Sequence, residues 1–339
     1  MAEQEVVKKK KKEVDAGSAK GQQITMIFVI IGICILWSIM SPFFLTVDNF
    51  VTVIHTMTVT TIAGYGMTVC LINGGVDLSL GYTICLSGIT CVMVVDDYYG
   101  KKDSSGSIAL GLLVGIGTGV LIGLINGIVV AKFGLPPYLT TLAMQMICKG
   151  LAYLLPGMGP VYLATSTPFR EIAQTRFGDV VPITMIYVIA FGLVFWFFLR
   201  KTVLGRRFYA IGSNGEAARL SGINTANVRI CAYIVTSMVA SLAGILQAAR
   251  TNAGSQSNGV GMEGDATVAA VIGGTSMGGG HGSLWGCIIG GLFMTLLKNG
   301  MNLLKINPNW QFVLIGVFLI ISVIIDQIRR EREMNKIDQ

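Results

Sequence analysis

The stretch SIALGLLVGIGTGVLIGLINGIVVA, residues 107–131, contains no Asp, Glu, Lys or Arg. About 20 apolar residues in a helix are enough to cross the hydrocarbon core of a bilayer. No acidic residue falls anywhere between Asp103 and Glu171, as expected of a region in lipid, where a central charge costs about 3 kcal/mol or more. The stretch therefore predicts a membrane-spanning helix.

The whole chain has the same character. Of its 339 residues, 53% are hydrophobic and only 13% are charged, and the mean hydropathy is +0.67. A soluble domain carries about 25% charged residues. Acidic residues are also absent between Glu216 and Glu263 and between Asp265 and Asp326. This composition argues against a large soluble α/β domain and predicts an all-α polytopic membrane protein.

We predict about ten transmembrane segments in two related halves, with re-entrant or broken helices. The first segment follows the run Lys8 to Lys12 and lacks a signal-peptide cleavage site, so we expect a retained anchor. The eighth is short for a full crossing, and we expect a half-helix. The predicted segments cover residues 24–41, 50–73, 80–95, 107–131, 136–155, 183–199, 226–248, 265–276, 283–304 and 309–326.

Lysine and arginine predict the orientation, because cytoplasmic loops carry an excess of them. With both termini in the cytoplasm, sixteen of the 25 Lys and Arg residues lie inside and six lie outside. The formal net charge of +7 is then an orientation signal and a source of affinity for anionic membrane lipid. The alternative for the lysine run is an RNA-binding tail, but a solvated basic tail accounts for it, and we predict no nucleic-acid partner.

Motifs that carry chemistry are scarce. The seven cysteines fall in predicted spans without metal-ligand spacing, and we expect buried thiols. GVGMEG, residues 259–264, lacks the preceding strand that a phosphate-binding loop needs. His55 and His281, the only two histidines, are too few for a metal site. We therefore predict no catalytic residue, no metal, no cofactor and no ATP site in this chain.

Two glycine-rich segments are predicted to interrupt helices inside the membrane. Freed backbone groups are tolerated there only against protein or a water-filled path, and paired interruptions often flank a transport path. Asp77 and Ser79 can cap the helix that starts near Leu80; alternatively, Asp77 is only a cap at the cytoplasmic boundary. The residues assigned to the two interruptions are Gly74, Gly75, Asp77 and Ser79 in the first half, and Gly273, Gly274 and Thr275 in the second.

Glycines recur every four residues from Gly111 to Gly127 and from Gly282 to Gly290. Such stripes let helix backbones approach closely, so we predict internal packing seams; contact with a second copy of the chain is the alternative. Each stripe leads towards an Asn-Gly pair, at Asn126 and at Asn299. Each asparagine either lines a path for hydroxyl-rich solutes or bonds an adjacent carbonyl.

The polar segment GSNGEAARLSGIN, residues 212–224, lies in the cytoplasm in this topology. Ser213 and Glu216 fit an S-x-x-E capping box, and Gly222 is placed to end a short helix in the left-handed conformation. A two-turn helix is marginal alone in water, so capping at both ends favours a helix that docks on a partner. The alternative is an ordinary cytoplasmic loop.

TVLGRRFYAIGSNGEAARLSGIN, residues 202–224, resembles the cytoplasmic coupling loop of permease subunits in bacterial ribose- and galactose-type ABC importers, of the branched-chain amino acid/ribose permease family. Four further stretches match the same family, and together they cover about residues 40–328. They are SPFFLTVDNF (41–50), GGVDLSLG (74–81), GDATVAAVIGGTSMGGGHG (264–282) and LKNGMNLLKINPNWQ (297–311).

The resemblance implies a non-catalytic subunit of the bacterial cytoplasmic (inner) membrane, with basic tail 1–23, permease domain 24–328, coupling loop 200–225 and tail 329–339. It implies three partners: a cytoplasmic ABC ATPase subunit, an extracytoplasmic sugar-binding protein and a second permease copy, as a homodimer. The substrate is expected to be a neutral monosaccharide. The residues expected to couple to the ATPase are Gly212, Ser213, Asn214, Glu216, Ala217, Ala218, Arg219 and Gly222.

The candidate translocation path combines the two interruptions with Asn126, Asp265, Asn299 and Asn302. A path of Asn, Ser and Thr without charge suits a neutral sugar, and INPNWQ, residues 306–311, is slightly closer to galactose-type than to ribose-type permeases. The alternative function is an ion-coupled secondary transporter or channel for small polar solutes. Proton coupling usually places acids mid-membrane, whereas Asp77, Asp265 and Asp326 are predicted near span ends.

Overall fold

The structure is a computed structural model that describes residues 21, 23–99, 105–163, 168–178 and 181–335. The run Lys8 to Lys12 therefore lies outside the described residues. An amino-terminal helix covers Gln23–Met40. The elements that follow are α2 (Val47–Ile72), α3 (Leu80–Tyr99), α4 (Ser105–Lys132), α5 (Pro137–Leu154), β1 (Val161–Tyr162), α6 (Pro168–Gln174), β2 (Arg176–Phe177), β3 (Val181–Pro182), α7 (Ile183–Lys201), α8 (Val203–Ser213), α9 (Gly215–Leu220), α10 (Thr225–Thr251), β4 (Ala253–Gly254), α11 (Met262–Ile272), α12 (Leu284–Leu303) and α13 (Asn309–Asn335).

A helix lies at each of the ten places predicted from hydropathy, and the fold is an all-α polytopic membrane protein. By length and composition, six of the described helices can cross a membrane: the amino-terminal helix, α4, α7, α10, α12 and α13. The eighth predicted segment is the short helix α11, of 11 residues.

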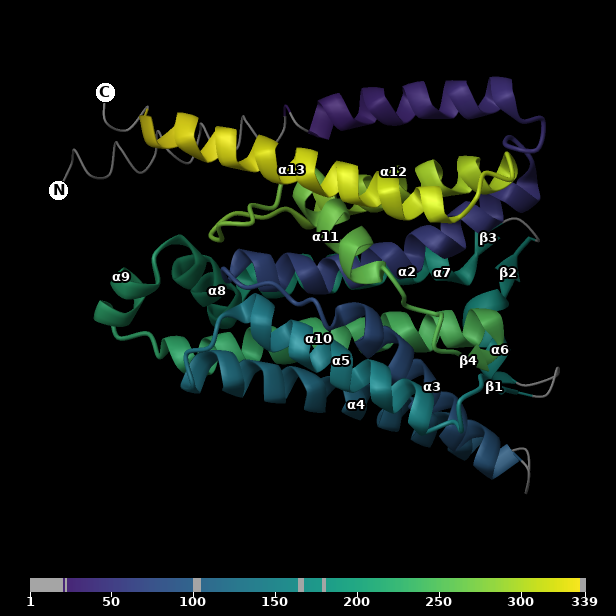
Figure 1. Cartoon of the computed structure of the whole chain (residues 1–339), viewed down its shortest axis with the longest axis horizontal. Helices are drawn as coiled ribbons and strands as arrows, with labels where there is room; N and C mark the ends of the chain where they lie inside the picture. Colours follow the sequence, from purple (N-terminus) through teal and green to yellow (C-terminus); the bar gives the residue numbers. More distant parts are fainter. Residues whose placement is uncertain (1–20, 22, 100–104, 164–167, 179–180, 336–339) are drawn as a thin grey trace.

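Two groups of helices pack together through α2 and α10 (Figure 1). α10 lies against α3 and α4, while α2 lies against α11 and α12. The amino-terminal helix also belongs to the second group, because its Trp37 packs with Leu296 and Met301 of α12. The two sequence halves are thus not separate bodies in space, since the first two helices pack among the last ones.

The glycine stripes are internal seams, as predicted. A Cβ at Gly119 or Gly123 of α4 would lie within 3.0 Å of backbone oxygens of α10, and a Cβ at Gly290 of α12 would do the same at Ala269 of α11. Real Cβ atoms essentially never approach so closely. The stripes therefore hold helices of one chain together.

The outer faces of the bundle are apolar. Phe28 and Ile39 of the amino-terminal helix, Leu154 of α5, Phe197 of α7 and Ile320 of α13 are all more than half exposed. Apolar surface of this extent is rare on a soluble monomer. These faces fit the acyl chains of a bilayer.

The two ends of the bundle differ. Two short antiparallel pairs, β1 with β4 and β2 with β3, lie at one end, and α8 and α9 lie at the other (Figure 1). Gln23 of the amino-terminal helix bonds Ser283, and Asp326 of α13 bonds Ser276. Ser276 and Ser283 belong to the α11–α12 loop, which packs on α8 through Gly279 and Gly280. Both ends of the helical chain therefore lie near α8 and α9.

Candidate coupling and translocation site

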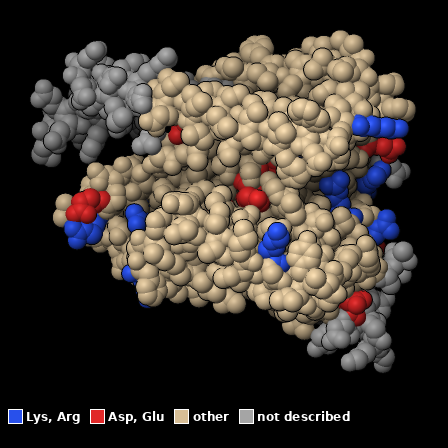
Figure 2. Space-filling model, viewed as in Figure 1, with Lys and Arg blue, Asp and Glu red and all other residues tan. Residues whose placement is uncertain are grey.

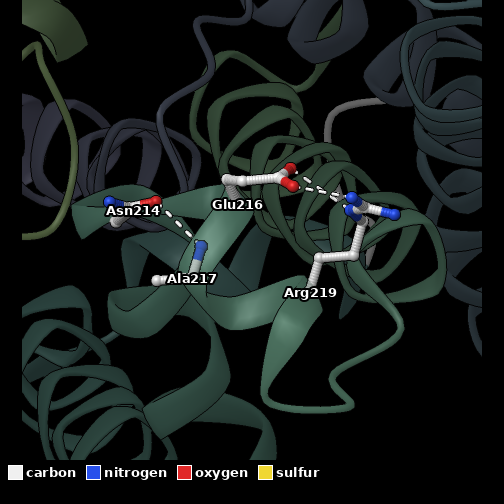
Figure 3. Close-up of polar contacts among 4 residues, drawn as sticks. All are labelled: Asn214, Glu216, Ala217 and Arg219. Atoms are coloured by element: carbon white, nitrogen blue, oxygen red, sulfur yellow. Dashed lines mark hydrogen bonds and ion pairs between the residues drawn. The ribbon is translucent and has the colours of Figure 1, made fainter.

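The short helix α9 is capped by Asn214, and the predicted capping box of Ser213 and Glu216 is wrong. Asn214 has an extended backbone (φ −161°), and its Oδ1 accepts a 2.9 Å hydrogen bond from the amide of Ala217 (Figure 3). Ser213 is still the last helical residue of α8. The start of α9 is thus one residue later than the motif indicated, which places Ala217, not Glu216, at the third helical position.

The end of α9 is as predicted. Gly222 has φ +81°, and its amide bonds the carbonyl of Arg219 at 3.0 Å while the amide of Ile223 bonds that of Ala218 at 3.1 Å. This is the Schellman pattern, which needs a left-handed residue at its turn. With Asn214 at the start, both ends of this two-turn helix are capped within the chain.

The outer face of α9 is free for a partner. Only Ala218 is buried (5% exposed), whereas Leu220 is 77% exposed. Glu216 and Arg219 form an exposed ion pair, with Arg219 Nη2 2.6 Å from Glu216 Oε1 (Figure 3). The hydrogen bond and charge of Arg219 lower the pKa of the Glu216 carboxyl below its usual value. α9 therefore presents an apolar side chain beside a fixed pair of charges.

Gly212, at the end of α8, connects α9 to both helix interruptions. The amide of Gly280, in the α11–α12 loop, donates to the carbonyl of Ile72 at the end of α2 at 2.9 Å. A Cβ at Gly212 would lie within 3.0 Å of both of these groups. Tyr209 of α8 adds a hydrogen bond from its hydroxyl to the carbonyl of Gly282 at 3.3 Å. We call this contact of Ile72, Gly212 and Gly280 the glycine junction.

The two interruptions end their preceding helices in the same way. Gly74 (φ +79°) follows α2 and Gly274 (φ +96°) follows α11. In each case the amide of the next residue, Gly75 or Thr275, bonds a carbonyl five residues back, at 3.0 Å and 2.9 Å. The glycine-rich interruptions predicted in the two halves therefore share one feature, a Schellman motif at the end of the preceding helix. Gly273, also assigned to this interruption, packs against Gly286 of α12.

Asp77 lies inside the bundle, so the alternative of a cap at the cytoplasmic boundary is wrong. It is fully buried, and its Oδ1 accepts from the amide and hydroxyl of Ser79 at 2.9 Å and 2.5 Å. Ser237, midway along α10, donates to its other oxygen at 3.3 Å. Asn126 of α4 donates to Ser79 Oγ at 3.0 Å. Asp77 lies near helix ends, as predicted, because α2 ends at Ile72 and α3 begins at Leu80. It is nevertheless buried against the middle of α10.

The three remaining path candidates lie in three different places. Asp265 lines a cavity of about 150 Å³ between α2, α10, α11 and α12. Asn299 instead forms a reciprocal amide pair with Asn49 of α2, at 2.7 Å and 3.1 Å, and the exposed Asn302 accepts from Gln311. The Asn299 side chain therefore does not bond an adjacent carbonyl, and it does not line the cavity. Its hydrogen bonds with Asn49 join α12 to α2.

The cavity contains two basic residues, Lys298 and Arg250, that the predicted path did not include. Lys298 of α12 forms an ion pair with Asp265 of α11, and Arg250 of α10 also lines the cavity, with Nη1 3.0 Å from Thr56 Oγ1. Sequence reasoning overlooked Lys298, although a basic residue inside a predicted span was a usable signal, because intramembrane charges are expensive and usually functional. Asp265 was identified, but its partner was not.

Comparison with known proteins identifies the chain's relatives. The family model described as "Branched-chain amino acid transport system / permease component" matches residues 49–323. The chain is 33% identical over 313 residues to the ribose import permease protein of Escherichia coli (strain K12), covering 90% of this chain and 93% of that protein.

Two further relatives carry other sugar names. The D-allose transport system permease protein of Escherichia coli (strain K12) is 31% identical over 304 residues, covering 90% of this chain and 91% of that protein. The L-arabinose ABC transporter permease protein of Azospirillum brasilense is 30% identical over 309 residues, covering 91% and 88%. No solved structure matches the chain.

Proposed function

The chain belongs to the family described as branched-chain amino acid transport system / permease component, and on that premise we propose that it is the permease subunit of an ATP-driven ABC importer for a neutral monosaccharide. The observation that carries this proposal is the identity of 30–33% along about nine tenths of the chain to permeases named for ribose, allose and arabinose. Residues 24–328 then form the permease domain. An ion-coupled transporter is not favoured by this family.

We propose that α9 docks on a cytoplasmic ATPase subunit that this chain does not contain. The support is local: the helix is capped at both ends, exposes Leu220, and holds Glu216 and Arg219 in a fixed pair. A preformed helix loses less conformational entropy on binding than a flexible loop does. Through the glycine junction, a displacement of α9 would reach both interruptions directly.

We propose ten crossings with both termini in the cytoplasm of a bacterial inner-membrane protein. The excess of basic residues on the side of α9 supports this orientation. The amino-terminal helix and α13 also approach that end, through Gln23 and Asp326. An extracytoplasmic sugar-binding protein would then deliver the solute at the opposite end, where β1 to β4 lie (Figure 1).

We propose that two copies pair with a charged hollow between them. Figure 2 shows acidic atoms in a hollow near the centre of one face, over α11, with basic atoms beside it. Between α5 and α11, Gln145 donates to Glu263 at 3.2 Å, and the exposed Lys149 of α5 lies 5.9 Å from the ring centre of Tyr82. Charged groups within the membrane almost always face protein or water. Pairing across this hollow would keep them from lipid.

The docking proposal is tested by replacing Leu220 with a photo-crosslinking amino acid. The full chain is expressed together with an ATPase subunit and a sugar-binding protein of an ABC importer from the same organism. We expect a crosslinked product with the ATPase, and stoichiometric co-purification of the two chains. The same crosslinker at Leu154, which is 70% exposed on α5, is the control and should not capture the ATPase. Capture from Leu154 but not from Leu220 would overturn the proposal.

A further inference from the structure

The cavity between α2, α10, α11 and α12 is lined by residues of one copy of the chain. Its volume of about 150 Å³ equals that of an engineered apolar cavity that binds benzene. The space therefore suits one five- or six-membered ring. Unlike that apolar cavity, this one is lined mainly by polar side chains, among them Thr56, Gln247, Arg250, Asp265, Thr295 and Lys298.

Two atoms in the cavity wall need a partner. Asp265 is 4% exposed and Thr295 is 1% exposed. Within the described part of the chain, Asp265 Oδ1 and Thr295 Oγ1 are buried without a hydrogen-bond partner. A buried polar atom without a partner costs about 1–3 kcal/mol, so such atoms mark places that water or a ligand fills. Here a carboxylate acceptor and a hydroxyl, both buried, belong to two residues that line the same ring-sized space.

Both basic side chains around the cavity already have a polar partner. The second oxygen of Asp265 accepts from Lys298, and Arg250 donates to Thr56 at 3.0 Å. A neutral solute with several hydroxyl groups can both donate to the carboxylate and accept from Lys298 or Thr295. An anion would instead compete with Asp265 for Lys298. The arrangement favours a neutral polyhydroxy ring.

The cavity also lies on the entry side of the bundle. Arg250 is the next-to-last residue of α10, a helix whose first residue follows the α9 segment. Thr56 is in the first half of α2, a helix whose last residue belongs to the glycine junction. The cavity is therefore displaced from α9 towards the end where β1 to β4 lie.

We propose that this cavity binds one neutral aldose ring during import, with Asp265 Oδ1 accepting from one ring hydroxyl and Thr295 Oγ1 bonding another. This inference rests on the proposed function, and it assigns an entry-side sugar site to each copy of the chain, in addition to any path between copies. Asp265 and Thr295 are its two specificity residues.

The test uses saturation-transfer NMR of the full chain in lipid nanodiscs, with D-ribose as the probe. Thr295→Val keeps the side-chain shape and removes only the hydroxyl, and Asp265→Asn removes the charge. We expect each to raise the dissociation constant for D-ribose about two- to tenfold or more, the range of one hydrogen bond. The matched control is Thr61→Val, because Thr61 is also buried with an unpartnered hydroxyl but does not line the cavity.

Two outcomes would overturn the inference: unchanged D-ribose binding in Thr295→Val and Asp265→Asn, or stronger binding of D-ribose 5-phosphate than of D-ribose. ATP-driven uptake of D-ribose, D-allose and L-arabinose by the assembled transporter is measured on the same preparations. Normal uptake with unchanged nanodisc binding in both variants rejects the cavity site alone. Absence of uptake of any monosaccharide in the wild type rejects the proposed function instead.

Discussion

Replacing Gly212 with alanine tests whether the glycine junction links the docking helix to the interruptions. The new methyl group would lie within 3.0 Å of the Ile72 carbonyl and the Gly280 amide, which share a 2.9 Å hydrogen bond. Overpacking of this kind costs about 1–3 kcal/mol, and the disturbed hydrogen bond adds about 1 kcal/mol. Alanine regains up to about 1 kcal/mol of helix propensity in α8. We expect a net loss of about 1–3 kcal/mol of stability.

The matched control is Gly215→Ala, three residues along the chain. A Cβ there has its nearest neighbour, Arg229 Nη2, at 3.5 Å, which is ordinary contact. The assays are the apparent melting temperature of the full chain in nanodiscs and the ratio of sugar imported to ATP hydrolysed by the assembled transporter. We expect Gly212→Ala to lower both, and Gly215→Ala to leave both unchanged. Equal behaviour of the two variants would refute the reasoning.

Three further predictions concern the cap of α9, the α4 packing seam and the membrane topology. Asn214→Ala removes the cap of α9, worth about 0.5–2 kcal/mol, and should reduce co-purification of the ATPase, whereas Ser213→Ala should not. A loss of co-purification in Ser213→Ala but not in Asn214→Ala would mean that Ser213 and Glu216 cap the helix after all. Gly119→Leu should lower membrane accumulation and melting temperature because it separates α4 from α10, whereas Gly117→Leu, with no neighbour within 4 Å, should be tolerated; equal tolerance would mean that the stripe faces lipid. A reporter fused after Gly157, beyond α5, should be active only outside the cytoplasm, and a cytoplasmic signal there would reject the ten-span topology.

Hydropathy predicted the positions of the helices because the bilayer permits few alternatives. A backbone in lipid must satisfy its hydrogen bonds within the segment, so apolar length alone locates helices such as α4 and α10. Apolar length does not predict how deeply a segment between two helices lies inside the bundle. The segment before α3 re-enters the bundle and carries Asp77 to Ser237, a placement that tertiary packing decides and local sequence does not encode.

The start of α9 shows the same limit on a smaller scale. Ser213 and Asn214 are both good caps, and the sequence motif favours Ser213 because Glu216 follows at the right spacing. The structure uses Asn214 because α8 continues through Ser213, against the glycine junction. The pairing of Asp265 with Lys298 likewise depends on how α11 and α12 pack at Ala269 and Gly290. That packing joins residues 33 positions apart.

Monosaccharide import driven by a separate ATPase is the central claim, and uptake by proteoliposomes tests it most directly. The permease is reconstituted with its ATPase and binding protein, and labelled D-ribose, D-allose and L-arabinose are supplied on the binding-protein side. We predict accumulation of at least one of these sugars only when ATP, the ATPase and the binding protein are all present. Accumulation driven by a proton or sodium gradient without the ATPase, or none under any condition for any monosaccharide, would contradict the account.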